Sequence, residues 1–139
     1  MIGKDLEYRI KNLKLEFKDT PQPNLLIALP NGNLGIDFEV EVSTPEFTSL
    51  CPLNLSQPDY ASINITYIPD KLLVELKSLK FYLASFRMVP IFHEQIVPGI
   101  LVALTSLLDP KWIKIVGYFT VRGGLTTTIG AESGKEILE

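Results

Sequence analysis

Alternation of apolar and polar side chains marks four stretches of the chain as strands. Apolar residues occupy every second position of 36–42 and again of 61–67. A period of two is typical of a strand with one buried and one solvent-facing side. Residues 112–121 and the threonine-rich residues 125–129 flank Arg122-Gly123-Gly124, which is typical of a turn or bulge. They predict a second pair of strands.

Between the two pairs of strands the apolar spacing changes to that of helices. One run predicts a helix from about residue 78 to 87, and a second run, repeating every four residues, predicts a helix from about 93 to 108. Asp109-Pro110 ends the second run. The order strand, strand, helix, helix, strand, strand predicts an α+β domain with an antiparallel sheet and two helices on one face.

A chain of 139 residues suits one compact domain, which we expect to span 1–139. Residues 1–34 are expected to form an N-terminal extension, because 6–17 alternate only loosely with basic residues and Thr20-Pro21-Gln22-Pro23-Asn24 then interrupts them. Residues 131–139 are expected to form a flexible tail.

Composition narrows the function classes. Hydrophobic residues make up 46% of the chain and its net charge is -3, which gives no overall attraction to nucleic acid or anionic lipid. One cysteine and one histidine exclude an internal disulfide, a cysteine-based zinc site and a His-rich metal site. Charges near the N-terminus do not fit a secretory signal, and the longest apolar run, 96–108, is too short to span a bilayer. We expect a soluble, cytoplasmic protein.

The segment from Phe47 to Tyr60 holds the strongest chemical candidates. Cys51 is followed eight positions later by Asp59, and Pro52 and Pro58 lie between them. Because proline fixes φ and lacks a backbone donor, we expect both side chains on a stiff loop outside regular structure. A thiolate is a nucleophile, and a carboxylic acid can donate a proton to the group that the sulfur attacks. The alternative is a small buried hydrophobe, the commoner role of a lone cysteine.

Two basic clusters are candidates for binding a phosphate. Lys77 and Lys80 are spaced to share one helix face at a strand-to-helix junction. Arg122 precedes Gly123, where the backbone allows a close approach and the guanidinium can fork onto an anion. A solvated basic face and a simple turn are the respective alternatives.

His93 and Glu94 stand at the start of the second predicted helix. A carboxylate there can accept two hydrogen bonds from adjacent N–H groups, such as those of a guanine-like ring. It can also act only as a partner of the helix dipole, and the histidine can be purely structural.

Six segments occur together in the order found in 7-cyano-7-deazaguanine reductases. They are Phe47-Thr48-Ser49-Leu50-Cys51-Pro52, Gln57-Pro58-Asp59-Tyr60-Ala61, Glu75-Leu76-Lys77-Ser78-Leu79-Lys80-Phe81-Tyr82-Leu83, Ser85-Phe86-Arg87, Phe92-His93-Glu94 and Arg122-Gly123-Gly124. The chain thus resembles the short, single-module branch of these NADPH-dependent nitrile reductases of queuosine biosynthesis, from about residue 38 to 124.

The resemblance implies the tunnelling fold shared with GTP cyclohydrolase I, in which subunits join their sheets into a ring. Short members are similar to pentamers or stacked pentamers with active sites between subunits. The two open edges expected of a four-stranded sheet agree with such pairing.

The resemblance also implies roles for individual residues. As catalytic groups it implies Cys51, the nucleophile that forms a thioimide, Asp59, the proton donor, and His93. As substrate-binding groups it implies Val74, Glu75, Leu76, His93 and Glu94. As NADPH-binding groups it implies Lys77, Lys80, Arg122 and Gly123.

One departure from the family pattern affects the reaction centre. Leu53-Asn54-Leu55-Ser56 adds one residue between Cys51 and Asp59 and removes the usual glycine, so this segment must bulge.

Two alternative functions remain. A related amidinotransferase adds ammonia to the nitrile on tRNA in archaeosine synthesis, but it lacks the lysine motif that this chain retains, and the acidic balance disfavours direct tRNA binding. A non-catalytic ring protein that binds a purine or pterin would keep Glu94 and tolerate loss of Cys51.

Overall fold

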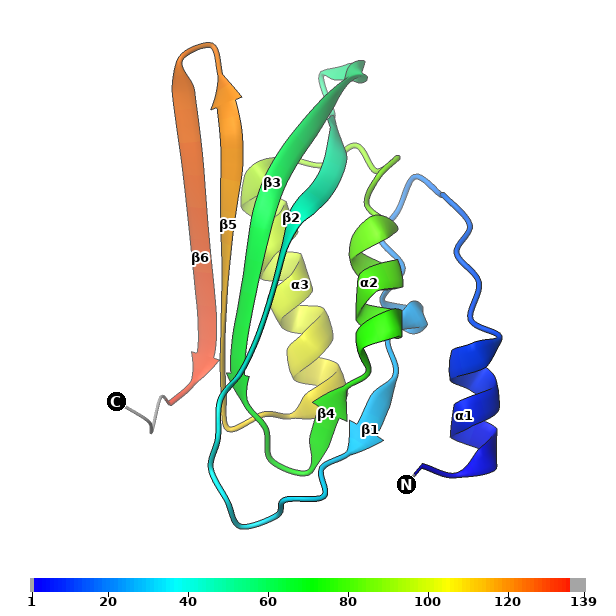
Figure 1. Cartoon of the computed structure of the whole chain (residues 1–139). Coiled ribbons are helices and arrows are strands. Elements are labelled where there is room, and N and C mark those ends of the chain that lie inside the picture. The colour runs from blue at the N-terminus through cyan, green and yellow to red at the C-terminus, as the bar shows by residue number, and fades with distance from the viewer. Residues whose placement is uncertain (1, 136–139) are drawn as a thin grey trace.

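The computed structural model describes residues 2–135, and its main sheet has four antiparallel strands in the order β2-β3-β5-β6. The strands are β2 (Val40–Cys51), β3 (Asn54–Ile68), β5 (Trp112–Arg122) and β6 (Leu125–Gly134). Helices α2 (Leu76–Ala84) and α3 (His93–Leu108) cover one face of this sheet (Figure 1). The predicted α+β architecture is confirmed.

A second, two-stranded sheet joins the segment before residue 34 to the rest of the fold. β1 (Ala28–Pro30) pairs antiparallel with β4 (Leu72–Val74), and the short 3-10 helix η1 (Pro23–Leu25) precedes it. Leu25, Leu26 and Ile27 are buried. The backbone N–H of Ile27 donates to the Ser78 hydroxyl at 3.0 Å, which ties this segment to α2.

Residues 4–11 form a helix, α1 (Lys4–Lys11), at the periphery of the molecule (Figure 1). The sequence predicts only an extension in this region and does not predict the helix. Acidic residues lie in the first turn and basic residues in the last, and Glu7 pairs with Lys11 at 2.9 Å one turn apart. Both features stabilise a helix, whereas alternation over so short a stretch is a weak signal.

Cys51 and Asp59 both lie in strands, so the expected proline-stiffened loop is wrong. Cys51 is the last residue of β2, and Asp59 lies inside β3 opposite Ser49. Only Pro52 and Leu53 separate the two strands. The inward side chains of residues 47, 49, 59 and 61 are buried, and burial of the apolar Phe47 and Ala61 favours pairing of the strands on both sides of the prolines.

Pro58 is tolerated in β3 because neither neighbour needs its missing N–H. Its partner Leu50 turns its backbone groups the other way, donating to Val89 O at 3.0 Å and accepting from Ile91 N at 3.2 Å. On the other side, the pairing of β3 with β5 begins only at Ala61. A proline is accepted in a strand at such unpaired positions.

The extra residue between Cys51 and Asp59 forms the bulge that the sequence predicts. Cys51 pairs with Asn54, while the adjacent Leu50 pairs with Pro58. Residues 55–57 therefore have no partner in β2, and the Asn54 side chain holds them by accepting from the Ser56 hydroxyl at 2.8 Å. The bulge keeps Asp59 in register with Ser49 despite the longer connection.

The ends of two strands differ from their predictions. β2 begins at Val40 rather than at Ile36, which is 61% exposed. β6 continues to Gly134, and the Trp112 ring N–H donates to Glu132 at 3.0 Å. Residues 131–134 are thus part of the sheet rather than a tail, and residues 136–139 lie outside the described part of the chain.

A single glycine lets α3 pack closely on the sheet. A Cβ at Gly117 in β5 would lie 2.8 Å from Val97 Cγ2 of α3 and 2.9 Å from Phe119 Cε2. Both distances are shorter than van der Waals contact allows. The absence of a side chain at Gly117 therefore fixes the depth at which α3 rests.

We predict that Gly117→Ala destabilises the fold by about 1–3 kcal/mol, because the methyl group must displace α3 or the Phe119 ring. The control is Gly130→Ala in β6, where a Cβ would meet only contacts at 3.9 Å and the change should stay within about 0.5 kcal/mol. Urea unfolding measures both. Equal stabilities of the two variants would contradict the close packing.

Candidate active site

Asp59 is the centre of a polar cluster drawn from three elements. Its side chain is 5% exposed, and its Oδ2 lies 3.1 Å from His93 Nε2 at the start of α3. Its Oδ1 forms an ion pair with the Arg122 guanidinium from the end of β5. Burying a carboxylate is costly unless it is paired and hydrogen-bonded. Arg122 supplies the opposite charge and His93 the contact to Oδ2, while Oδ1 accepts no hydrogen bond within the described residues.

His93 is positioned by residues 89–91, a short connection that is hydrogen-bonded to β2. The bonds between Leu50 and residues 89 and 91 form a parallel bridge centred on Pro90, which directs residues 91–93 toward the β2–β3 hairpin. The imidazole then stacks on the Phe119 ring, with centroids 4.1 Å apart and planes 12° from parallel. His93 is thus held between an aromatic face and a carboxylate.

His93 is neutral in this arrangement. Burial lowers the pKa of His93, and the nearby charge of Glu94 raises it in opposition. Because Arg122 already supplies a counter-charge to Asp59, the imidazole need not be protonated to stabilise it. A neutral ring with its hydrogen on Nε2 donates to the Asp59 carboxylate, which can only accept when ionised.

Cys51 lies on the same face of the sheet as this cluster. Asp59 faces Ser49 across the β2–β3 pair, and Cys51 is two residues further along β2. Side chains two residues apart on one strand point the same way. The β2–β3 register shifts between Leu50 and Cys51, so the ladder is not regular at this point. Cys51 is a free, half-buried cysteine and is not sealed in the core.

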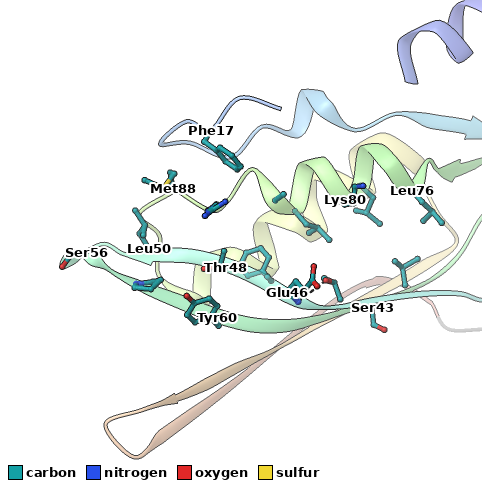
Figure 2. Close-up of a pocket in the computed structure, with 18 residues that line it drawn as sticks. Phe17, Ser43, Glu46, Thr48, Leu50, Ser56, Tyr60, Leu76, Lys80 and Met88 are labelled. Atoms are coloured by element: carbon teal, nitrogen blue, oxygen red, sulfur yellow. Dashed lines mark hydrogen bonds between the residues drawn. The ribbon is translucent and has the colours of Figure 1, made fainter. Parts of the chain in front are cut away.

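A cleft of about 740 Å³ runs between β2 and α2 (Figure 2). Leu50 and Ser56 line one end and Leu76 lines the other. Cys51, Asp59, His93 and Glu94 are not among the residues that line this cleft. Lys80 contributes a charged group to the wall that α2 forms. The cleft is large enough to hold a purine-sized ring with further groups attached.

Of the three residues expected to touch the base, only Leu76 lines this cleft, at the end opposite to Leu50. Val74 ends β4 and is buried, Glu75 caps α2, and Leu76 is 59% exposed. Both oxygens of Glu75 are used as the cap, accepting from the N–H groups of Lys77 and Ser78 at 2.7 Å. Leu76 and Leu50, the residue before Cys51, thus lie at opposite ends of the cleft.

Lys77 and Lys80 flank the Phe81 ring, each with its ammonium 5.6 Å from the ring centroid. Lys77 also donates to the Ile10 carbonyl of α1 at 2.8 Å. No carboxylate within residues 2–135 forms a salt bridge with either lysine. Two cations without anionic partners beside an open cleft fit the phosphates of a dinucleotide such as NADPH.

Glu94 and Gly123 are also accessible. Glu94 is exposed in the first turn of α3, beside His93. Gly123 lies at the tip of the β5–β6 hairpin with φ +57°, a conformation that favours glycine.

Comparison with known proteins decides the family. The family model for QueF-like protein matches residues 58–137. Three curated relatives, each named NADPH-dependent 7-cyano-7-deazaguanine reductase, come from Sinorhizobium fredii, Magnetococcus marinus and Parabacteroides distasonis. They are 45%, 44% and 50% identical over 88%, 86% and 79% of this chain and 79%, 92% and 69% of their own.

This chain belongs to the 7-cyano-7-deazaguanine reductase family. A solved structure, the archaeosine synthase QueF-Like in the apo form, is 23% identical and has a TM-score of 0.64 over 70% of this chain and 95% of that one. At that identity the likeness supports the shared fold alone. No helix in residues 2–135 is long and apolar enough to cross a membrane.

One residue of the cluster lies outside the family motifs, and a second lies within a motif without a role implied for it. Phe119 lies outside every segment that resembles the reductase family, yet it supports the imidazole. Ser49 is fully buried opposite Asp59, and its hydroxyl has no hydrogen-bond partner within the described residues. Alternation along the strands predicts that Phe119 and Ser49 are buried. It does not predict that Phe119 stacks on His93 or that Ser49 lies opposite Asp59.

We predict that His93 titrates below pH 6.5 in the free protein, because burial disfavours its charged form. As the only histidine, it gives a single set of imidazole signals, and a ¹⁵N-detected NMR titration measures it directly. A midpoint above pH 6.5 would mean that a charged imidazolium, rather than Arg122, balances Asp59.

Proposed function

We propose that this chain catalyses the NADPH-dependent reduction of the nitrile of 7-cyano-7-deazaguanine to the aminomethyl group. Relatives of 41–50% identity that are named for this reaction support the proposal. The observation that carries it is a free cysteine on the same strand face as a buried carboxylate that binds a histidine. Nucleophile, proton carrier and orienting group are the parts that addition to a nitrile requires.

The first step is addition of the Cys51 thiol across the triple bond. The sulfur–carbon bond forms as one π bond of the nitrile breaks, which places negative charge on nitrogen. Asp59 carries the proton from sulfur to that nitrogen, and His93 holds the carboxylate in place for both transfers. The product is a thioimide, and no net charge remains on the substrate.

Reduction of the thioimide needs a hydride donor. NADPH, the reductant in the relatives' name, would supply a hydride to the C=N carbon, with Lys77, Lys80, Arg122 and Gly123 as the candidate binding groups. Loss of the sulfur then leaves an imine, which a second hydride reduces to the amine. The protonation of nitrogen in each step falls to Asp59 and His93.

Recognition of the base is assigned to Glu94, which accepts two hydrogen bonds from adjacent N–H groups of the ring. Residues 74–76 are assigned to the same site, but Leu76 lines the end of the cleft opposite to Leu50, the residue before Cys51. A second copy of the chain that brings its residues 74–76 to Cys51 resolves this separation. We therefore propose a homo-oligomeric ring, a pentamer or stacked pentamers, with sites between subunits.

The alternative transfer of ammonia to a nitrile on tRNA is disfavoured by the two lysines, whose charges no carboxylate neutralises within the described chain. The single-domain organisation and the cytoplasmic location remain predictions from the sequence.

We predict that the wild-type protein gains the mass of 7-cyano-7-deazaguanine when the two are mixed without NADPH, and that Cys51→Ala does not. The thioimide is a covalent bond to sulfur, so intact-protein mass spectrometry detects it. Cys51→Ala should also lose all turnover. Turnover by this variant would exclude covalent catalysis through Cys51.

We predict that Glu94→Gln weakens binding of the base about tenfold or more, because an amide offers one acceptor oxygen and turns its NH₂ toward the ligand's donors. The matched control is Gln95→Ala, the next exposed residue of α3, which should bind as wild type does. Calorimetry with both in the Cys51→Ala background separates binding from reaction. Unaltered affinity of Glu94→Gln would remove Glu94 from the recognition role.

A further inference from the structure

Arg122 contacts Asp59 where β5 leaves β3. The regular pairing of these strands ends at Ala61 and Phe119, and β5 shifts register with β6 between Phe119 and Arg122. Beyond that point, side-chain hydrogen bonds from β5 to the backbone of β3 join the two strands. The Thr120 hydroxyl donates to the Tyr60 carbonyl at 3.3 Å, and Arg122 donates to the Pro58 carbonyl at 3.2 Å while pairing with the Asp59 carboxylate.

Within residues 2–135, only one of the groups that face the Asp59 carboxylate carries a full positive charge, and that group is the Arg122 guanidinium. From α3 comes His93, whose burial opposes protonation, with the acidic Glu94 beside it. From β2 come the uncharged Ser49, opposite Asp59, and Cys51 at the strand's end. From β5 comes Arg122. A carboxylate that is 5% exposed stays ionised only with such a partner.

This contact differs from the role that the family motif gives to Arg122. The motif assigns the guanidinium to a phosphate of NADPH, and one guanidinium cannot pair fully with a phosphate and with Asp59 together. The Arg122 side chain is 42% exposed, so it can move, whereas Asp59 cannot. In the protein without bound cofactor, the Arg122 guanidinium pairs with the Asp59 carboxylate.

We propose that Arg122 is a positioning residue for the proton transfer at Asp59, acting before any cofactor binds. Thiol addition requires a carboxylate that can take the proton from sulfur and return it to the nitrile nitrogen. A protonated Asp59 cannot take that proton, so the ion pair with Arg122 prepares the step. The kinetic part of this inference rests on the proposed function, but the electrostatic part does not.

The test compares Arg122→Gln with Arg122→Lys, which keeps the charge, and with Arg9→Gln, which removes an equal charge from the exposed surface of α1. The first readout is the His93 titration by NMR, with no ligand present. In Arg122→Gln a proton should replace the lost cation in the cluster, so the His93 midpoint should rise by about half a unit or more. It should stay near the wild-type value in the other two variants.

The second readout is the rate of thioimide formation with 7-cyano-7-deazaguanine, measured across pH without NADPH. Arg122→Gln should react at least tenfold more slowly at pH 7, and its loss of rate on acidification should begin at higher pH. Arg122→Lys should keep the wild-type pH dependence, and Arg9→Gln should match wild type throughout. Thermal melting confirms that each variant is folded, and Arg122→Lys alone remains informative if the glutamine variant is not.

An unaltered His93 titration in Arg122→Gln would overturn the proposal, as would normal thioimide formation with only NADPH affinity lost. The latter result would return Arg122 to the cofactor alone. If the wild-type protein forms no thioimide, the proposed function fails, and the ligand-free His93 titration still decides the role of Arg122.

Discussion

Burial of the Asp59 carboxylate is the constraint on which the rest of the site depends. A charge that is removed from water must be matched by partners brought from elsewhere in the chain, and here they come from α3 and from the end of β5. The start of α3 is positioned by the bridge to Leu50, and its depth is set by Gly117. Features that look purely structural thus determine where the proton carrier stands relative to Cys51.

The cleft between β2 and α2 separates residues that the family motifs assign to one site. Leu50, which precedes Cys51, and Leu76 line its opposite ends, and Leu76 begins α2, a helix of nine residues that is roughly 14 Å long. Leu76, which lines that far end, is largely exposed despite being apolar. Burial by a neighbouring copy would remove this exposure and bring both halves of the site into contact.

Much of this organisation could be predicted from the sequence. The period of two in β3 and the four-residue repeat of α3 identified elements whose burial is decided by hydrophobic contacts alone. The prediction failed where local and tertiary signals conflict. Pro52 and Pro58 indicate a loop, but alternating burial continues through Ser49 and Asp59. Leu50 bonds residues 89 and 91 and so does not need the N–H that Pro58 lacks. No local pattern reveals that β5 bends so that Arg122 reaches Asp59.

Motif resemblance and geometry also supply different kinds of information. The motifs name Cys51, Asp59 and His93 together, and Asp59 and His93 do make contact. The motifs separate Arg122 from that group, whereas the ion pair joins them. Whether Arg122 pairs with the cofactor or with Asp59 depends on distances in space, which the order of motifs in the sequence does not give.

The central claim is that this site reduces a nitrile rather than adding another group to it. The most direct measurement counts NADPH oxidised, from its absorbance, against the amine formed from 7-cyano-7-deazaguanine. Two NADPH consumed for each aminomethyl product is the predicted result. Formation of an amidine with uptake of ammonia, while NADPH remains unchanged, would contradict it.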